Sequence, residues 1–312
     1  MHRPTKNKRI PIYREGDLVR IKTNGEIKST LDPASKREGC LFTTQMAEYS
    51  GKEFKIIKTV KNFFDEHECK MYRVIPPLYI LEGLICEGRV QSLAQRCDHS
   101  CYLLWHEDWL EKVDGPDANG GVADTADPYL QKGEDPTPNG PQKSEQFNSG
   151  CQLMSIKDVA EYNPWYENLF QSKIKLIWSA KKTLNFLKNR LLDPIGLKNG
   201  KPIATSISQD ELVPGDIVRV KPREEILALL DDWGRTKGCV FTPEMFNRCG
   251  QRYRVLKQVH YFYDEVKERI CRCRDMVLLE GAVCSGQRRL FPSDCDRNCF
   301  QFWHVSWLEK EG

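Results

Sequence analysis

The sequence predicts a mainly β protein that contains two tandem copies of one small β-barrel, each with a few short helices. Three observations support this fold class. The chain repeats itself at a nearly constant spacing, apolar residues alternate with polar ones or form short runs, and few segments show the longer period of a helix. With 312 residues, the chain is long enough for roughly two domains of about 100–200 residues each.

The internal repeat consists of sequence identities at two fixed offsets. At an offset of 199, positions 16–66 give 20 identities in 51, and at an offset of 198, positions 81–112 give 14 identities in 32. Repeats of this kind are typical of a duplicated structural unit. We therefore predict two Cys-rich β modules, at residues 14–112 and 213–310.

Within the first module, the elements can be taken in chain order. Asp17–Lys22 alternates polar and apolar residues, which predicts a half-buried strand. Glu26–Leu31 and Thr43–Tyr49 predict short helices, and the second begins at a threonine that can cap it. Phe54–Val60 and Leu78–Cys86 are rich in Ile, Val, Leu and aromatic residues, which predicts two further strands. Short strands at close spacing favour a small barrel or sandwich.

Two different segments separate the modules. Residues 113–154 carry seven acidic and two basic residues and are rich in Gly, Pro, Asn and Asp, which predicts a flexible acidic linker. Residues 155–192 have an apolar row seven residues apart, from Phe170 to Leu191, which predicts an amphipathic helix. We expect this helix to pack on a module of its own chain. Self-association or a partner helix, and binding to a membrane surface, are the alternatives.

Charge and hydropathy exclude some classes of protein. No run approaches the roughly 18 apolar residues that a membrane span needs. The first residues lack the apolar stretch of a secretory signal, so we expect a cytoplasmic protein. The net charge of +3 is small for a dedicated polyanion binder, which leaves nucleic acid as a weakly supported partner.

Thirteen cysteines without an export signal favour metal or thiol chemistry over a disulfide framework. Each module contains three cysteines with gaps of ten and three residues, then a histidine after four more, and also one upstream cysteine. A structural zinc ion takes four such ligands in a tetrahedron. We predict two Zn²⁺ per chain, bound by Cys86, Cys97, Cys101 and His106 in the first module and by Cys284, Cys295, Cys299 and His304 in the second, with Cys40 and Cys239 as alternative fourth ligands.

Other interpretations of the cysteines stay open. They include buried thiols without metal, a disulfide such as Cys97–Cys101, and an iron–sulfur cluster. No general base is evident beside the thiols, which disfavours a catalytic zinc. The sequence does not assign four further cysteines to a site: Cys69, Cys249, Cys271 and Cys273.

Two strings resemble known families. Gly16–Lys22 resembles the first strand of SH3-like barrels. The string Leu-Glu-Gly from Leu81, then Cys-x3-Cys and Trp-x3-Trp-Leu, resembles an uncharacterised bacterial Cys-rich repeat domain found in hypothetical proteins, over most of each module. That resemblance implies no activity. The family often has Lys or Arg where this chain has His106 and His304, which disfavours histidine as the fourth ligand.

These features predict a non-catalytic binding or scaffold protein with two related interaction surfaces on zinc-stabilised modules. A protein partner is expected, because linked modules gain affinity through effective concentration. The alternatives are a metal- or thiol-dependent enzyme, or an enzyme accessory subunit, and a nucleic-acid-binding protein.

Overall fold

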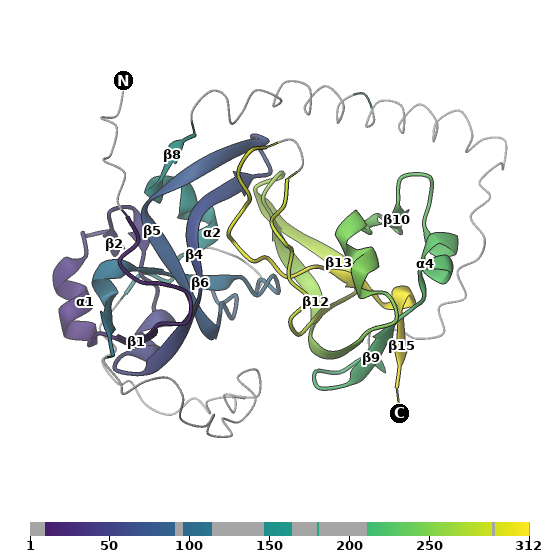
Figure 1. Cartoon of the computed structure of the whole chain (residues 1–312), viewed down its shortest axis with the longest axis horizontal. Helices are drawn as coiled ribbons and strands as arrows, with labels where there is room; N and C mark the ends of the chain where they lie inside the picture. Colours follow the sequence, from purple (N-terminus) through teal and green to yellow (C-terminus); the bar gives the residue numbers. More distant parts are fainter. Residues whose placement is uncertain are drawn as a thin grey trace. The chain divides into compact units, whose positions relative to one another are not determined.

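A computed structural model describes residues 10–90, 96–113, 147–163, 180, 211–288 and 291–311 of the chain. The chain divides into two compact units. Figure 1 labels the helices and strands of both units. Unit 1 comprises Met1–Phe63, Tyr72–Tyr162 and Cys295–Asn298, and unit 2 comprises Phe64–Met71, Asn163–Asp294 and Cys299–Gly312. Each unit is described by itself.

Unit 1 is built on an antiparallel sheet with the strand order β6-β5-β4-β1-β7, and β8 pairs with the outer part of β5. Short helices connect or cover the strands. The elements are β1 Leu18–Ile21, α1 Asn24–Thr30, β2 Lys36–Arg37, β3 Cys40–Leu41, η1 Met46–Tyr49, β4 Glu53–Asp65, β5 Lys70–Ile85, β6 Tyr102–His106, η2 Glu107–Trp109, β7 Leu110–Lys112, α2 Gln152–Ser155, η3 Ile156–Val159 and β8 Ala160–Tyr162.

Local sequence explains the first elements. Thr23 and Glu26 form a capping box, in which the Thr23 amide donates to Glu26 Oε2 at 2.9 Å, and this box starts α1. The β2–β3 hairpin turns at Glu38 and Gly39, whose φ angles are +49° and +95°. A two-residue hairpin turn with two positive φ angles favours glycine at one of them.

The mainly β prediction is confirmed, and the strands are longer than expected, because β4 has 13 residues and β5 has 16. A closed barrel is not seen in the described residues. The first sheet is an open path whose ends, β6 and β7, are joined along the chain by the single turn of η2.

Unit 2 contains an antiparallel sheet with the strand order β14-β13-β12-β9-β15, which matches the path of the first sheet. Among the described strands of unit 2, β8 has no counterpart. The elements are β9 Ile217–Val220, α4 Arg223–Leu229, β10 Arg235–Thr236, β11 Cys239–Val240, η7 Pro243–Arg248, β12 Arg252–Asp264, β13 Arg269–Leu279, β14 Trp303–His304, η8 Val305–Trp307 and β15 Leu308–Lys310.

Aromatic side chains form the centre of each core. Trp105 and Trp109 are completely buried in unit 1, and Trp303 and Trp307 are completely buried in unit 2. Trp307 donates its indole N–H to Thr236 Oγ1 at 2.9 Å, which satisfies its polar atom inside the core. The four tryptophans therefore stabilise the sheets rather than forming an exposed platform.

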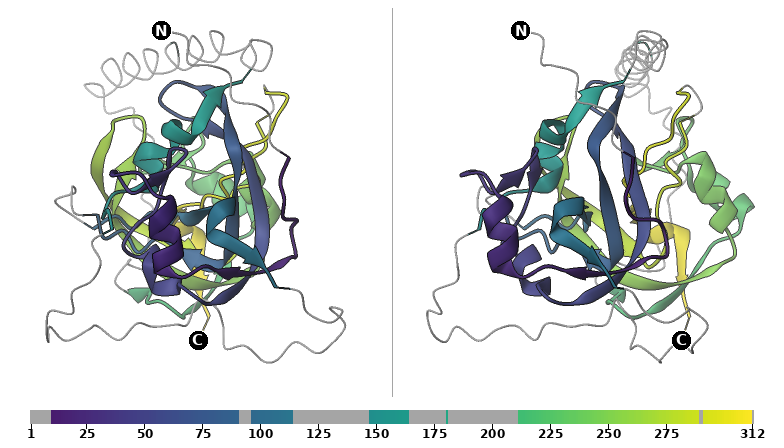
Figure 2. Two further views of the ribbon diagram at one scale, coloured as in Figure 1. Left: turned by 90° about the vertical axis from the view of Figure 1, so that its left-hand side faces the viewer. Right: turned by 60° about the vertical axis from the view of Figure 1, so that its left-hand side comes forward.

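Residues 147–162 differ from the linker and helix predicted for them. Phe147 is buried, and the chain continues through α2 and η3 into β8, which pairs Ala160, Glu161 and Tyr162 with β5. Figure 2 shows this teal segment alongside β5. Ile156 and Val159 of η3 are buried, and from Ala160 the chain forms a short strand instead of continuing the helix predicted from residue 155. Most of the predicted helix, from 164 to 192, lies outside the described residues apart from position 180.

Candidate functional site

Backbone hydrogen bonds bring the first cysteine triplet together. The amide of Cys86, just after β5, donates to the Cys101 carbonyl at 2.7 Å. The amide of Cys97 donates to the Gly88 carbonyl at 3.1 Å. A side chain on Gly88, whose φ is +76°, would overlap the backbone of Cys97, so this close approach requires glycine. The three residues predicted from the repeat therefore share one corner of unit 1.

In the turn after the first cysteine of each triplet, a backbone amide donates a hydrogen bond to the sulfur of that cysteine. The Gly88 amide donates to Cys86 Sγ at 3.3 Å, and the Gly286 amide donates to Cys284 Sγ at 3.2 Å. Both glycines have a φ of +76°. Hydrogen bonds of this kind favour the charged thiolate, which is the form that binds metals.

The second triplet repeats part of the first arrangement. The Cys284 amide donates to the Cys299 carbonyl at 2.8 Å, and Cys295 is buried. All thirteen cysteines are free thiols, so no Cys97–Cys101 disulfide is present. Within the described part of the chain, no group of three or more His, Cys, Asp or Glu side chains is arranged to hold a metal ion. Zinc binding therefore stays a prediction.

The predicted histidine ligands lie at a different place in the fold. His106 is the last residue of β6, five residues after Cys101, which corresponds to about 16 Å at roughly 3.3 Å per residue of strand. Its Nδ1 accepts the Asp108 amide at 3.0 Å and so caps η2. His304 accepts the Ser306 amide in the same way at 3.1 Å. The structure does not bring either histidine to its triplet.

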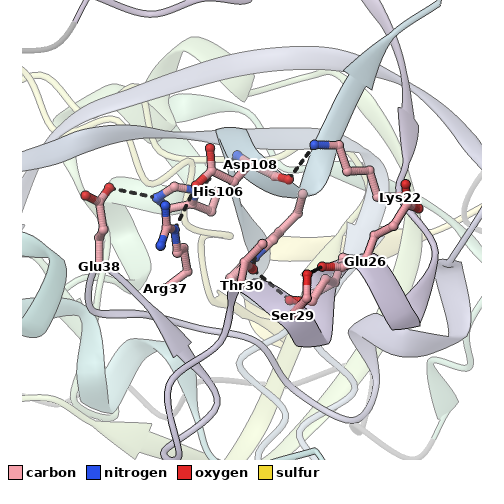
Figure 3. A network of polar contacts seen from close by, with 10 residues as sticks. Lys22, Glu26, Ser29, Thr30, Arg37, Glu38, His106 and Asp108 are labelled. Carbon is pink, nitrogen blue, oxygen red and sulfur yellow. Dashed lines mark hydrogen bonds and ion pairs between the residues drawn. The ribbon is translucent and has the colours of Figure 1, made fainter.

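The buried ring of His106 lies among charged side chains that influence its pKa. Its Nε2 lies 3.2 Å from Glu38 Oε2, while Arg37 Nε donates to Asp108 Oδ2 at 2.7 Å, as Figure 3 shows. Burial lowers the pKa of His106, and the carboxylates of Asp108 and Glu38 oppose that shift. Lys22 adds a hydrogen bond to the Asp108 carbonyl at 2.9 Å. This cluster fixes the turn between β6 and β7.

The buried histidine of unit 2 predicts a loss of stability in acid. Burial, with Lys237 as the next cause, lowers the pKa of His304 to about 4, against partial opposition from Asp275. The unfolded chain would bind a proton at this group near pH 6.5, so between pH 6.5 and 4 only the unfolded state is protonated. The difference between these two pKa values corresponds to about 3 kcal/mol before screening by solvent, so we expect the stability of unit 2 to be full above pH 6.5 and to fall by roughly 2 kcal/mol toward pH 4.

Unfolding measured against pH, in wild type and in His304→Asn, tests this expectation. The amide oxygen of asparagine can still accept the Ser306 N–H, but it does not titrate. The variant should show a weaker pH dependence in this range. Equal pH dependence in both proteins would contradict the assignment.

Cys40 and Cys239, the alternative fourth ligands, are also engaged elsewhere. Cys40 Sγ lies 3.8 Å from the Leu104 carbonyl, and Cys239 Sγ lies 3.8 Å from the Phe302 carbonyl. Burial raises the pKa of the Cys40 thiol, and it raises the pKa of the Cys239 thiol to about 12. Both are therefore protonated at neutral pH, which suits a packed side chain better than a ligand.

The structure adds Cys151, which lies in the predicted linker. Burial raises the pKa of this thiol to about 11, and Cys86 and Cys97 are close enough to contribute to the shift. The neighbouring contacts agree: Gln152 binds the backbone of Leu104, three residues after Cys101. Comparison of the two repeats could not find Cys151, because no residue of the second module corresponds to it.

Residues 147–162 fill a groove on unit 1, between β3 and β6. The Gln152 amide donates to the Leu41 carbonyl at 2.7 Å and to the Leu104 carbonyl at 2.8 Å. It accepts the Leu104 amide at 2.9 Å. Ile156 and Val159 are buried against the same groove. One polar side chain and two apolar ones therefore hold this segment.

Unit 2 carries an open cleft of about 1420 Å³ at the corresponding place. Cys239 and Val240 of β11 line one side, Phe302 lies before β14, and Cys273 and Met276 belong to β13. Val240 is 46% exposed there, whereas Leu41, at the matching position of unit 1, is 4% exposed. The cleft offers both apolar and charged side chains to a ligand.

The described helices include none that is both long and apolar enough to cross a bilayer. Comparison of the chain with protein-family models, with curated proteins and with solved structures finds no significant match.

Proposed function

We propose that the chain is a non-catalytic binding and scaffold protein made of two related modules, residues 14–112 and 213–310. Each module would be an SH3-like β fold with its own interaction surface. The equal strand order of the two sheets and the shared hairpin, cap and cysteine positions support a duplication. The SH3-like description rests on the opening strand and on the single turn of η2 between the last two strands.

The difference between the two grooves is the observation that supports binding as the function. The groove of unit 1 is filled by residues 147–162 of the same chain, and the cleft of unit 2 is open. A polypeptide therefore already occupies one of two matching surfaces. Clefts with an apolar floor and a few polar groups are the usual places for ligands.

A structural zinc ion in each module remains part of the proposal. Cys86, Cys97 and Cys101 would provide three thiolates in unit 1, and Cys151 is a further candidate for the fourth ligand beside His106 and Cys40. Closed sites of four protein ligands stabilise small domains and leave no position for substrate. In the second module the cysteines that match this triplet in sequence are Cys284, Cys295 and Cys299, of which Cys284 and Cys299 are joined by a backbone hydrogen bond.

Selection from a library of random peptides, equal in length to residues 147–162, tests the binding function. The full-length chain and its Val240→Asp variant would be used side by side, because Val240 is exposed in the cleft and the aspartate should not disturb the fold. We expect peptides that bind the wild-type chain and not the variant. Failure to enrich any such peptide would overturn the proposed function.

A further inference from the structure

The segment that fills the groove of unit 1 indicates what the open cleft of unit 2 binds. We propose that this cleft takes a segment of a partner protein with the chemistry of residues 152–162. That chemistry is a glutamine, apolar side chains four and seven residues later, and a carboxylate six residues later, as in Gln152, Ile156, Asp158 and Val159. This inference rests on the proposed binding function and names its ligand.

The turn glycines show that the two surfaces match. Gly39 and Gly238 lie 199 residues apart in the β2–β3 and β10–β11 turns, with φ angles of +95° and +90°. A Cβ on Gly39 would overlap the Asp158 carbonyl, because the segment of unit 1 passes directly over this turn. A Cβ on Gly238 would meet nothing within 4 Å. The space that the segment takes in unit 1 is therefore open in the part of unit 2 that the structure describes.

Unit 1 binds the glutamine through backbone atoms, and these are present whatever the side chains at the matching positions of unit 2. Gln152 contacts the backbone of Leu41 and Leu104. The offsets of 199 and 198 pair these residues with Val240 and Phe302, and both of them line the cleft. A glutamine side chain of a ligand can therefore form the same pair of hydrogen bonds with unit 2.

The apolar positions have counterparts too. Cys40, Leu78 and Leu104 line the space beside Ile156 and Val159 in unit 1. Their counterparts, Cys239, Met276 and Phe302, all line the cleft. Aliphatic side chains at the Ile156 and Val159 positions would cover these groups and the exposed Val240, which removes apolar surface from water.

Charge favours an acidic ligand. In unit 1, Lys36 Nζ pairs with Asp158 Oδ2 at 2.7 Å, and Arg235 stands at the position of Lys36 in unit 2. Arg235 lies on β10, outside the residues that line the cleft, whereas the lining includes Arg272 and Arg274 of β13 and the carboxylates of Glu66, Glu244 and Asp275. A carboxylate at the Asp158 position can therefore pair with Arg235, and a further acidic residue near the strand would meet these arginines.

A strand of the ligand can add to β13 as β8 adds to β5. The turns of the β4–β5 and β12–β13 hairpins each contain a residue with a positive φ angle, Cys69 and Glu268, and these two residues are 199 positions apart. Counting on from these turns, Tyr72–Val74, which pair with β8, correspond to Cys271–Cys273 of β13. Addition of a strand to a sheet edge is a common mode of peptide recognition.

The first part of the segment has no open counterpart. In unit 1, Phe147 packs on Phe42 with ring centroids 5.0 Å apart. In unit 2, Phe241, the counterpart of Phe42, already packs on Phe246 at 4.7 Å. Pro243, which replaces Thr44, also lacks the amide that donates to the Asn148 carbonyl in unit 1. The ligand of unit 2 is thus expected to begin at the glutamine.

The experiment uses a fluorescent peptide with the sequence of residues 151–162, with serine in place of Cys151, and the full-length chain. We expect saturable binding in an anisotropy titration, weakened about tenfold or more by Val240→Asp in the chain or by Gln152→Ala in the peptide. Leu227→Asp is the matched control, because Leu227 is half exposed on α4 and does not line the cleft. That variant should bind as the wild type does.

A charge exchange tests the predicted ion pair. Arg235→Glu in the chain and Asp158→Lys in the peptide should each weaken binding severalfold, and the two together should restore part of the affinity. If Val240→Asp leaves the affinity for the peptide unchanged, the peptide binds to unit 1 instead. If the wild-type chain forms dimers and Val240→Asp makes it monomeric, a second copy of the chain is the occupant of the cleft. Either result, or the absence of saturable binding, would overturn the inference. If the library still yields peptides of other chemistry, the proposed binding function survives this failure.

Discussion

Replacement of Cys97 by serine is expected to lower the zinc content from two ions per chain to one and to unfold unit 1. Cys97 is buried beside Gly88, and its thiolate would be one of four ligands. Loss of a ligand from a structural zinc site removes much of the free energy that metal binding adds to folding, more than about 3 kcal/mol. Elemental analysis, together with denaturant unfolding followed by tryptophan fluorescence, measures both effects.

Matched variants make this result specific. Cys295→Ser should remove the other ion, and Cys151→Ser should act like Cys97→Ser if Cys151 is the fourth ligand. Cys249→Ser is the control, because Cys249 is the C-cap residue of η7, belongs to neither triplet and should leave two ions bound. His106→Asn should also leave the zinc content unchanged. Metal-free wild-type protein with freely reactive thiols would reject the zinc proposal.

Replacement of Gly39 by alanine is expected to release residues 147–162 from unit 1. The new methyl group would overlap the backbone of Asp158. Alanine with this positive φ costs about 1–2 kcal/mol in addition. Because Gln152 would lose three hydrogen bonds of roughly 1 kcal/mol each, we expect the local opening free energy of the segment to fall by about 3 kcal/mol or more. Amide hydrogen exchange in residues 156–162 should become at least about 100-fold faster.

Gly238→Ala is the matched control for this change. It has the same backbone strain, with a φ of +90°, but nothing within 4 Å of the new methyl group. Exchange in residues 156–162 should stay unchanged in this variant, while unit 2 loses only the strain energy of about 1–2 kcal/mol. Equal effects of both substitutions on residues 156–162 would show that the segment does not depend on the contact with Gly39.

The two glycines also show why the sequence predicts some features and misses others. The repeated string Gly-Cys-Leu/Val-Phe-Thr indicates a shared local structure, and the β2–β3 turn explains its glycine by positive φ angles alone. The contact of Gly39 with Asp158 joins parts of the chain that are far apart in sequence and occur in one copy only. No local pattern contains that information.

The approach of the first three cysteines was predictable from the repeat, whereas a metal site formed by them stays a prediction. The equal gaps in the two triplets point to one arrangement, and backbone hydrogen bonds do bring Cys86, Cys97 and Cys101 together. Histidine was a reasonable fourth ligand by spacing alone. The extended strand β6 carries His106 about 16 Å away, and only the fold shows that distance.

β8 has a consequence for the behaviour of the protein at high concentration. It covers the backbone of β5 at Tyr72–Val74, where an uncovered strand could pair with another molecule. Among the described strands of unit 2, none takes this place, and the matching part of β13 has exposed arginines at 269, 272 and 274. Their mutual repulsion would keep two such strands from joining edge to edge, as charged edges do in other soluble sheets. The same arginines that would attract an acidic ligand would thus also guard the chain against aggregation.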